Sequence, residues 1–470
     1  MNQLEKVKSA VIYNLLSKRL IKAIHSNLET GPLNFDYLAK HTLPSWMKSE
    51  NIVRFARRMV RDKRHAGRMM LKKFFKSPHG GQMLKYVLDN ASPACKKGLF
   101  KNFLVNHLII GNYKREKLIK KGNIVPFLLV VSPTMTCNLN CFGCYAGEYT
   151  KEKELDFKTV DRVLEEAKKL GIYFITISGG EPFYWPHFLK ILEKHNDMFF
   201  MVYTNGTLIN EKLAKKLSRL GNAMPAISVE GFEKETDARR GKGTFKKIMK
   251  AMDNLKKHGV IFGFSATLTK NNLNSIASSK FIDFYVKKGC MYGWYFLYVP
   301  IGKKPNINLM ATPEQRLKLR KFTAEVRATK PIFVGDFWND GPFVDGCIAA
   351  GKNEGYLHIT SKGDVEPCVF LHFAVDNIRN KSLKKAFNSD FFKEIQKRQP
   401  YCENLLTPCA LIDNPQVLRE VVKKYNAKPT HPGAENIIKD KKVMKHLDNY
   451  SAKTKKLFEP LWQKEYKHWA

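Results

Sequence analysis

The sequence predicts an α/β fold: a partial (β/α)6 TIM-type barrel between an N-terminal helical basic domain and a small C-terminal Cys-rich domain. Two observations predict it. Six short apolar runs alternate with amphipathic stretches between about residues 127 and 300, and seven of the nine cysteines gather in two groups. We expect four segments: a basic helical domain over 1–122, the barrel core over 123–310, the Cys-rich domain over 311–412 and a basic helical tail over 413–470.

The N-terminal segment is expected to be mostly helical and strongly basic. Residues 1–128 hold 26 Lys and Arg against seven Asp and Glu, half of the excess in a chain whose formal net charge is +38. Candidate helices cover 11–24, 50–64, 68–75 and 98–113. Such a basic surface can simply be solvated, can contact anionic membrane or can bind nucleic acid. Charge alone does not choose among these three alternatives.

Targeting signals are not apparent in the sequence. No segment resembles a signal core, and no apolar run reaches the roughly 18 residues of a spanning helix. Nine cysteines in 470 residues are too few for a secreted disulfide scaffold. We therefore expect a cytoplasmic protein, with peripheral contact with the inner face of the membrane as an alternative.

The central segment predicts parallel β-strands joined by helices. The apolar runs are "FLLVVSP", "FITISGG", "FFMVYTNG", "MPAISVEG", "FGFSATLT" and "WYFLYVPIG", and the stretches between them include "TVDRVLEEAKKLG" and "EKLAKKLSRLG", which end in a glycine cap. Right-handed βαβ units place ligands at the carboxyl ends of the strands. The tripeptides and turns "SGGEP", "TNG" and "SVEG" fall at those ends.

Three cysteines follow the first predicted strand with the spacing C-x3-C-x2-C: Cys137, Cys141 and Cys144. Structural zinc usually takes four closed ligands, and a disulfide would leave one thiol over. Three thiolates on a compact loop can instead bind three irons of a [4Fe–4S] cluster and leave the fourth iron open for a small molecule.

With these cysteines and the strand-end motifs, the sequence resembles the radical S-adenosylmethionine (SAM) superfamily. In that family the open iron chelates SAM, and an electron from the cluster cleaves SAM to methionine and a 5′-deoxyadenosyl radical, which abstracts hydrogen from a substrate. "SGGEP" resembles the motif for the amino group of SAM, and "SVEGFEKETDARRGKGTF" resembles a pattern for its carboxylate or ribose. The resemblance implies these SAM-contact residues: Gly179, Gly180, Glu181, Pro182, Thr204, Asn205, Ser228, Glu230, Arg240 and Thr267.

Further positions are implied with less direct roles. Asp237 would orient the helix that carries Arg240, and Asn271 would reach the adenine edge with Thr267. One position departs from the family: the residue before the third cysteine is commonly aromatic, whereas here it is Gly143. Phe142 or Tyr145 is expected to take its place beside the adenine.

A second cysteine set lies in the C-terminal part. Cys347 and Cys368 flank a hairpin-type turn at Gly363, between "YLHIT" and "VEPCVF". The form C-x15-G-x4-C resembles the opening of the SPASM and twitch auxiliary-cluster domains, and Cys402 and Cys409 complete four ligands. An auxiliary iron–sulfur cluster is favoured over a single iron or a zinc ion.

The remaining cysteines, Cys95 and Cys290, are expected to be packing residues.

The expected function is that of a radical SAM enzyme, an oxidoreductase or one that forms C–C or C–S bonds, on an unidentified substrate. Peptide or protein modification is favoured by the frequency of such enzymes among auxiliary-cluster relatives. One alternative is modification or coupling of lipid chains at the membrane surface. Another is a non-enzymatic, metal-containing nucleic-acid-binding protein.

The expected cofactors are the SAM-binding [4Fe–4S] cluster, SAM and the auxiliary cluster. The expected partners are an electron donor such as flavodoxin or ferredoxin, and a peptide, lipid or small-molecule substrate.

Overall fold

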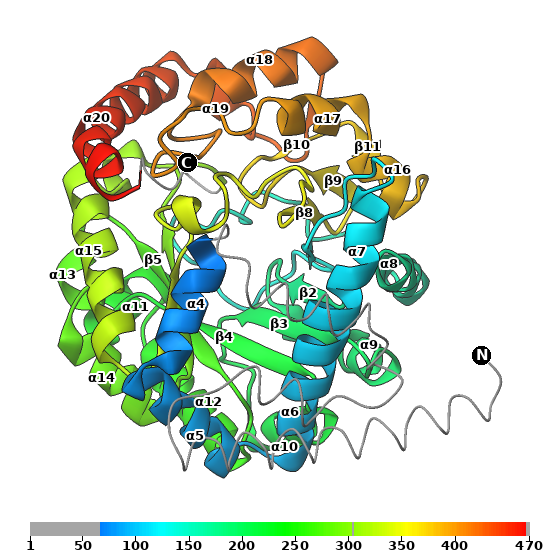
Figure 1. The fold of residues 1–470 in the computed structure, drawn as a ribbon, viewed down its shortest axis with the longest axis vertical. Helices are drawn as coiled ribbons and strands as arrows, with labels where there is room; N and C mark the ends of the chain where they lie inside the picture. The colour runs from blue at the N-terminus through cyan, green and yellow to red at the C-terminus, as the bar shows by residue number, and fades with distance from the viewer. Residues whose placement is uncertain (1–65, 303–304, 467–470) are drawn as a thin grey trace.

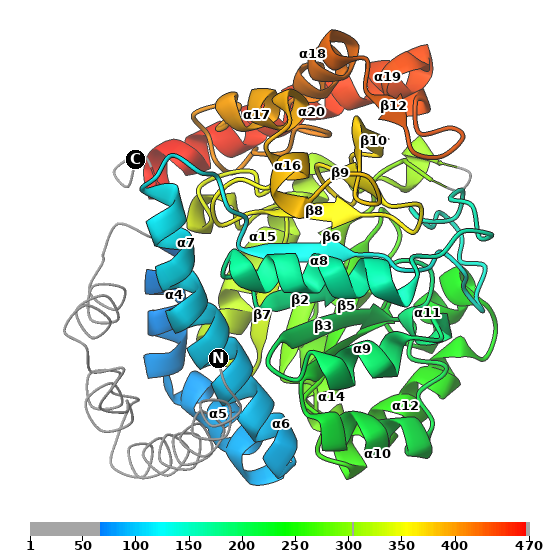
Figure 2. The same cartoon turned by 90° about the vertical axis from the view of Figure 1, so that its right-hand side faces the viewer.

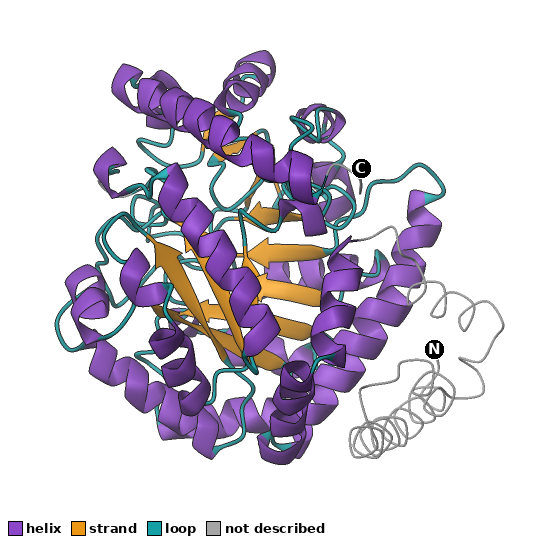
Figure 3. Ribbon diagram, turned by 60° about the vertical axis from the view of Figure 1, so that its left-hand side comes forward, coloured by secondary structure: helices purple, strands orange, loops and turns teal. Residues whose placement is uncertain are grey.

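A computed structural model describes residues 66–302 and 305–466 of the chain. The predicted helices over 11–24 and 50–64 lie outside the described residues. Within them, strands form an inner layer surrounded by helices (Figure 3). Among the described residues, no helix is both long and apolar enough to cross a membrane.

A ten-stranded sheet forms the centre of the fold, in the order β11-β9-β8-β1-β2-β3-β4-β5-β6-β7. The eight strands from β8 to β7 run parallel; at one edge β9 pairs antiparallel with β8, and β11 pairs antiparallel with β9. The six predicted strands are β1 to β6, so the partial-barrel prediction is confirmed. The strands are β1 Leu128–Val131, β2 Phe174–Ile177, β3 Phe199–Thr204, β4 Ala223–Val229, β5 Gly263–Leu268, β6 Tyr292–Leu297, β7 Phe333–Asp336, β8 Tyr356–Ile359, β9 Asp364–Glu366 and β11 Asp376–Asn377.

Helices cover the outer face of the barrel because each presents an apolar stripe to the strands. Buried aliphatic residues of β1 to β6 that point outward pack with these helices in the largest core cluster. The covering helices are α8 Phe157–Lys169, α9 Phe188–Lys194, α10 Glu211–Leu220, α11 Glu233–Arg240, α12 Thr244–Lys257, α13 Leu273–Ile276, α14 Ser279–Lys288 and α15 Pro313–Thr329, with short 3-10 turns η2 Pro182–Tyr184, η3 Ile307–Leu309 and η4 Gly341–Phe343.

The N-terminal helices close the amino end of the barrel. They are α4 Ala66–Lys76, α5 Pro78–Asn90, α6 Pro93–Lys97, the π-helix η1 Gly98–Gly111 and α7 Asn112–Ile119, and Figure 2 shows α4, α5 and α7 along that side. Asn102 donates to the Met198 carbonyl just before β3, and Arg115 donates to the Gly171 carbonyl before β2. Phe174 and Phe199 pack against this layer together with Cys95, which is buried as expected. The barrel is therefore covered at its amino end, opposite the strand-end motifs.

The C-terminal part lies across the β8–β1 side of the barrel, with α18 at the top and α20 at the upper left of Figure 1. The predicted hairpin is present as β8 and β9, and Gly363 takes a φ of +92° in its turn. Arg316 of α15 forms a fully buried ion pair with Asp413 at 2.6 Å. The remaining elements are β10 Phe373–Ala374, which pairs with β12 Lys428–Pro429, and the helices α16 Leu383–Phe387, α17 Asp390–Lys397, α18 Pro415–Tyr425, α19 Asn436–Lys439 and α20 Lys441–Glu465.

Candidate active site

The three clustered cysteines lie on the loop between β1 and α8, which we call the cluster loop (132–156). All three are free, partly buried thiols. Burial, together with the charges of Glu181, Cys141 and Cys144, raises the pKa of Cys137 to about 11. Thiols gathered in this way become thiolates when a cationic metal centre binds, because the metal offsets the cost of placing their charges together. The donor set therefore fits an iron–sulfur cluster.

The two glycines of "SGGEP" let the end of β2 lie directly against the cluster loop. A Cβ at Gly179 would lie 2.2 Å from the Thr134 carbonyl oxygen, and one at Gly180 would lie 2.2 Å from that of Thr136. The Gly180 amide donates to the Thr134 carbonyl at 3.0 Å. Only glycine allows this approach, so the glycines fix the position of the residue just before Cys137.

Glu181 is fully buried and holds the end of β3. Its Oε1 accepts a 2.7 Å hydrogen bond from the Thr204 hydroxyl, and its Oε2 accepts one of 2.8 Å from the Asn205 amide. Burial raises the pKa of Glu181 to about 7, against the hydrogen bonds that lower it. Pro182 follows as the first residue of η2. The carboxylate thus joins the ends of two neighbouring strands.

Asn205 ties the end of β3 to the cluster loop. Its Nδ2 donates to the Asn138 side-chain oxygen at 2.8 Å and approaches the Cys137 sulfur at 3.7 Å. Its Oδ1 accepts from the Thr207 amide and hydroxyl. Both ends of this amide are therefore oriented, and the donor end points to a cluster cysteine.

Two arginines of α11 converge on one carboxylate at the end of β4. Glu230 is almost fully buried, and its Oε1 accepts from Arg239 at 2.8 Å and from Arg240 at 2.6 Å. Arg239 also donates to the Phe142 carbonyl of the cluster loop at 3.2 Å. Asp237 accepts from the Gly243 and Phe245 amides at the start of α12, so it joins α11 to α12.

The ends of β4 and β5 carry the remaining predicted contacts. Ser228 and Thr267 are partly exposed strand residues near these ends. Asn271 is exposed. Its neighbour Asn272 is buried and donates to the carbonyls of Glu230 and Thr267, at 3.0 and 2.9 Å. Sequence reasoning missed Asn272, because two adjacent asparagines in a turn give no burial signal.

Gly143 has a structural reason in this chain. Its φ is +62°, and a Cβ there would lie 2.8 Å from the ring of Tyr298, at the end of β6. Of the two residues expected to replace an aromatic side chain here, Phe142 is 46% exposed, whereas Tyr145 is partly buried and pairs with the Ser178 hydroxyl at 2.8 Å.

In the C-terminal set, Cys347, Cys368 and Cys409 are close enough for their charges to interact. The Tyr356 hydroxyl lies 2.8 Å from the Cys368 sulfur. Cys402 instead contacts Asn404 and Thr407. That all four cysteines serve as ligands stays a prediction.

A buried polar network that the sequence did not reveal joins the two cysteine regions. Glu366, two residues before Cys368, accepts from the hydroxyls of Tyr149 on the cluster loop and Thr430 of the tail, and pairs with His358 at 2.6 Å. Burial alone would raise the pKa of Glu366, but His358 and the hydrogen bonds hold it below its ordinary value. The partners lie 64 to 217 residues from Glu366, apart from His358, so no local pattern could predict them.

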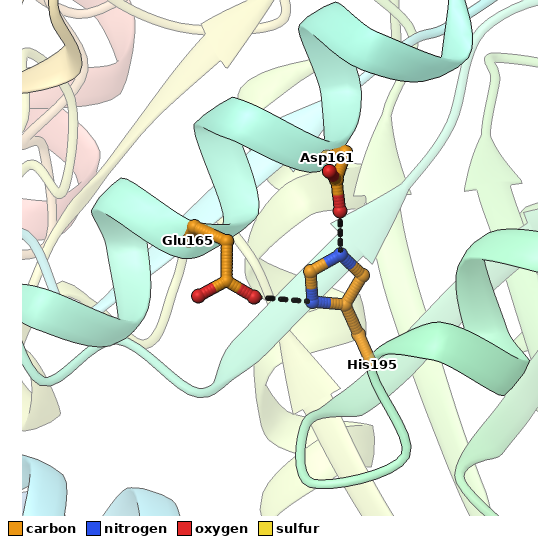
Figure 4. Close-up of side chains that lie close together, drawn as sticks. All are labelled: Asp161, Glu165 and His195. Carbon is orange, nitrogen blue, oxygen red and sulfur yellow. Dashed lines mark hydrogen bonds and ion pairs between the residues drawn. The ribbon is translucent and has the colours of Figure 1, made fainter. Parts of the chain in front are cut away.

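Asp161, Glu165 and His195 form a separate group of metal-ligand type on the outer side of the barrel (Figure 4). The two carboxylates lie beside different nitrogens of the His195 ring. An Asp161 oxygen lies 2.9 Å from Nε2, and a Glu165 oxygen lies 3.6 Å from Nδ1. Lys194 pairs with the other Asp161 oxygen at 2.7 Å. This arrangement is that of an ion cluster joining α8 to the end of α9.

Comparisons with known proteins match both cysteine regions. The family model described as "Radical SAM superfamily" matches residues 131–278, and the SPASM model, "Iron-sulfur cluster-binding domain", matches residues 347–410. An uncharacterized protein of Methanocaldococcus jannaschii is 32% identical over 41% of this chain and 69% of its own length. The AdoMet-dependent heme synthase of Methanosarcina barkeri is 25% identical over 62% of this chain and 90% of its own length. The mycofactocin maturase MftC of Mycobacterium tuberculosis is 25% identical over 60% of this chain and 75% of its own length.

A solved structure shares the fold. Streptococcus suis SuiB bound to its precursor peptide SuiA has a TM-score of 0.54 and 19% identity, over 70% of this chain and 80% of that chain.

Proposed function

Because this chain belongs to the radical SAM superfamily and carries its SPASM iron–sulfur domain, we propose that it is a radical SAM enzyme that modifies a peptide or protein. Its cofactors are SAM, the SAM-binding [4Fe–4S] cluster and auxiliary iron–sulfur chemistry in the SPASM domain. The observation that carries the proposal is the convergence of the cluster loop with the ends of β2, β3 and β4 at the carboxyl edge of the barrel.

Cys137, Cys141 and Cys144 would hold the first cluster, which when bound supplies the electron that cleaves SAM. The chain's own residues bind and orient. The predicted SAM contacts lie at or near the ends of β2, β3, β4 and β5. Hydrogen bonds of Glu181, Asn205 and Asn272 join these ends to one another and to the cluster loop. Such preorganisation matters because a misplacement of about 1 Å at a reacting group can cost about 100-fold in rate.

Five aromatic rings gather among the cluster loop, β3, β6 and the C-terminal part. Tyr203 packs against Phe296 with ring centroids 5.7 Å apart, and Phe370 lies 5.7 Å from Tyr145 on the cluster loop and 6.1 Å from Phe337. All five rings are partly exposed. These rings support a substrate group that is apolar or aromatic, as in many peptide side chains.

Two kinds of relative support two substrate classes. MftC is a maturase, and SuiB was solved with a precursor peptide, which supports a peptide. The second candidate is a tetrapyrrole, supported by the AdoMet-dependent heme synthase, of which this chain spans 90%, and by the same aromatic rings, which suit a planar macrocycle. Membership in an enzyme superfamily sets aside the non-enzymatic nucleic-acid-binding alternative. Contact with a membrane is not needed for either proposal. We further propose flavodoxin or ferredoxin as the electron donor.

The test is release of 5′-deoxyadenosine by anaerobically reconstituted protein with dithionite and SAM, with Cys137→Ala as control. Cell extract is separated by ultrafiltration, and the retained fraction is assayed before and after protease treatment. We expect the retained fraction to stimulate release and protease to abolish the stimulation. Stimulation by an iron tetrapyrrole such as Fe-coproporphyrin III, or by the small-molecule filtrate alone, would contradict the peptide proposal. No release under any condition would contradict the enzymatic one.

A further inference from the structure

The outer surface of α10 and of the start of α12 carries lysines that no carboxylate neutralises. Each of these two helices has one acidic residue, and both are engaged elsewhere: Glu211 pairs with Lys257 at 2.7 Å, and Asp253 pairs with Lys288 at 2.9 Å. Six exposed lysines, which we call the lysine face, have no ion-pair partner among the described residues: Lys212, Lys215, Lys216, Lys242, Lys246 and Lys247. Because α10 and α12 pack side by side, these charges act as one positive field.

The lysine face borders the cluster loop. The Asn138 side chain donates to the hydroxyl of Thr207, which lies just before α10, at 2.7 Å. Phe142 makes two contacts with Arg239 near the end of α11: its amide donates to the Arg239 carbonyl at 3.0 Å, and its carbonyl accepts from Nε at 3.2 Å. Lys242 follows Arg239 by three residues. The lysines therefore begin where the cluster loop meets α10 and α11.

An exposed aromatic ring lies on the cluster loop at this border. Phe142 directly follows Cys141 and is 46% exposed, one of four large apolar side chains that are exposed in the described part of the chain. An apolar contact inside a charged rim is the usual anatomy of a protein–protein interface. Phe142 and the lysine face together have this composition.

We propose that Phe142 and the lysine face form the docking surface for an acidic one-electron carrier protein of the flavodoxin or ferredoxin class. This inference rests on the proposed function, in which each cleavage of SAM consumes one electron. The carrier is oxidised by one electron, the first cluster accepts it, and no bond of the chain forms or breaks. Docking here brings the carrier against the loop that holds Cys137, Cys141 and Cys144.

The surface fits a protein carrier better than a membrane or a nucleic acid. A helix that lies on a membrane inserts its apolar face, but α10 and α12 bury theirs in the barrel, with Leu217 and Ile248 fully buried. Nucleic-acid sites commonly combine arginine forks with stacked rings, whereas all six charges here are lysines. Lysines at the rim of an interface speed association, which suits a complex that forms and separates at every turnover.

The test measures binding of oxidised flavodoxin to the full-length, reconstituted protein by isothermal titration calorimetry. In the triple variant Lys242→Glu, Lys246→Glu and Lys247→Glu, we expect the dissociation constant to rise about tenfold or more at low salt. The difference from wild type should shrink as salt approaches about 1 M, where the screening length is about 3 Å. Phe142→Ala should weaken binding at low and high salt alike, because an apolar contact is not screened.

Matched controls separate this surface from overall charge. Lys441→Glu, Lys442→Glu and Lys445→Glu make the same change of charge on exposed residues of α20, which lies at the opposite end of the molecule from α10 and α12 (Figures 1 and 2). Leu71→Ala removes a 39% exposed apolar side chain from α4. Both controls should bind flavodoxin as wild type does. Equal weakening by the two triple variants would overturn the proposal, as would a lysine-face variant that loses binding to phosphatidylserine vesicles or single-stranded RNA but keeps flavodoxin.

Activity with two reductants distinguishes this inference from the proposed function. Dithionite is a small molecule that needs no docking surface, so the lysine-face variant should release 5′-deoxyadenosine at the wild-type rate with dithionite and more slowly with reduced flavodoxin. Equal rates with reduced flavodoxin, at a concentration below the dissociation constant, would overturn the docking surface alone. Absence of release from wild type with dithionite would contradict the proposed function, while the calorimetric comparison would still test the surface.

Discussion

Replacing Gly180 by alanine should damage the first cluster far more than it damages the fold. The added Cβ would lie 2.2 Å from the Thr136 carbonyl oxygen and 2.5 Å from that of Met135, both backbone atoms of the cluster loop. Ordinary contact begins at 3.4 Å, so the loop must move by about 1.2 Å, the difference between the two distances. Overpacking of this kind costs about 1–3 kcal/mol. Because Cys137 follows Thr136, its sulfur moves with the loop.

The assay for this prediction combines unfolding with cluster chemistry. In Gly180→Ala we expect a fall in SAM-dependent 5′-deoxyadenosine release of about 100-fold, and loss of the change in the EPR spectrum when SAM is added. Gly263→Ala is the matched control, because its Cβ would meet the Tyr292 carbonyl oxygen at the same 2.2 Å, at the start of β5. It should lose similar stability but keep the SAM-dependent spectrum. A Gly180→Ala protein with wild-type release and spectrum would refute the reasoning.

Three further predictions concern buried groups. Glu181→Gln should lower the free energy of unfolding by about 1–3 kcal/mol in urea titrations, since its amide group cannot accept from both Thr204 and Asn205; an unchanged midpoint would contradict this. Arg316→Ala should cost about 3–5 kcal/mol by leaving Asp413 buried and unpaired, whereas Arg398→Ala, at a partly exposed pair, should cost about 1 kcal/mol or less; equal costs would contradict the assignment. Burial lowers the pKa of His372 to about 4, so the unfolded chain binds the proton first and stability should fall as pH drops from about 6.5 to 4; urea midpoints of wild type and His372→Gln should converge over this range, and parallel curves would contradict it.

Local patterns were enough to predict the parts of the fold that depend on neighbouring residues. The six strands and their glycine-capped helices follow from periodicity, and the β8–β9 hairpin follows from its turn. The sheet is wider than six strands because β7 and β8 add to it, and β8 reaches β1 from more than 200 residues away. A four-residue strand of this kind carries no sign of its partner.

The candidate site was also predicted only in part. Cysteine spacing and strand-end motifs predicted which residues belong to it, but not the contacts that these residues make. Arg239 and Arg240 could not be told apart in sequence, and in the structure both bind Glu230. Cys402 was predicted from a four-cysteine count, which says nothing of its contacts with Asn404 and Thr407.

The cluster loop is held from several sides, which links the two cysteine regions mechanically. Gly180 contacts it from β2, Asn205 from β3 and Arg239 from α11. From the SPASM side, Glu366 holds Tyr149, five residues after Cys144. Glu366 lies two residues before Cys368, so it is one direct link between the two regions, and Arg379 adds another through the Glu154 carbonyl and Asp156. The C-terminal part therefore contributes contacts that position the cluster loop, beside those from the barrel.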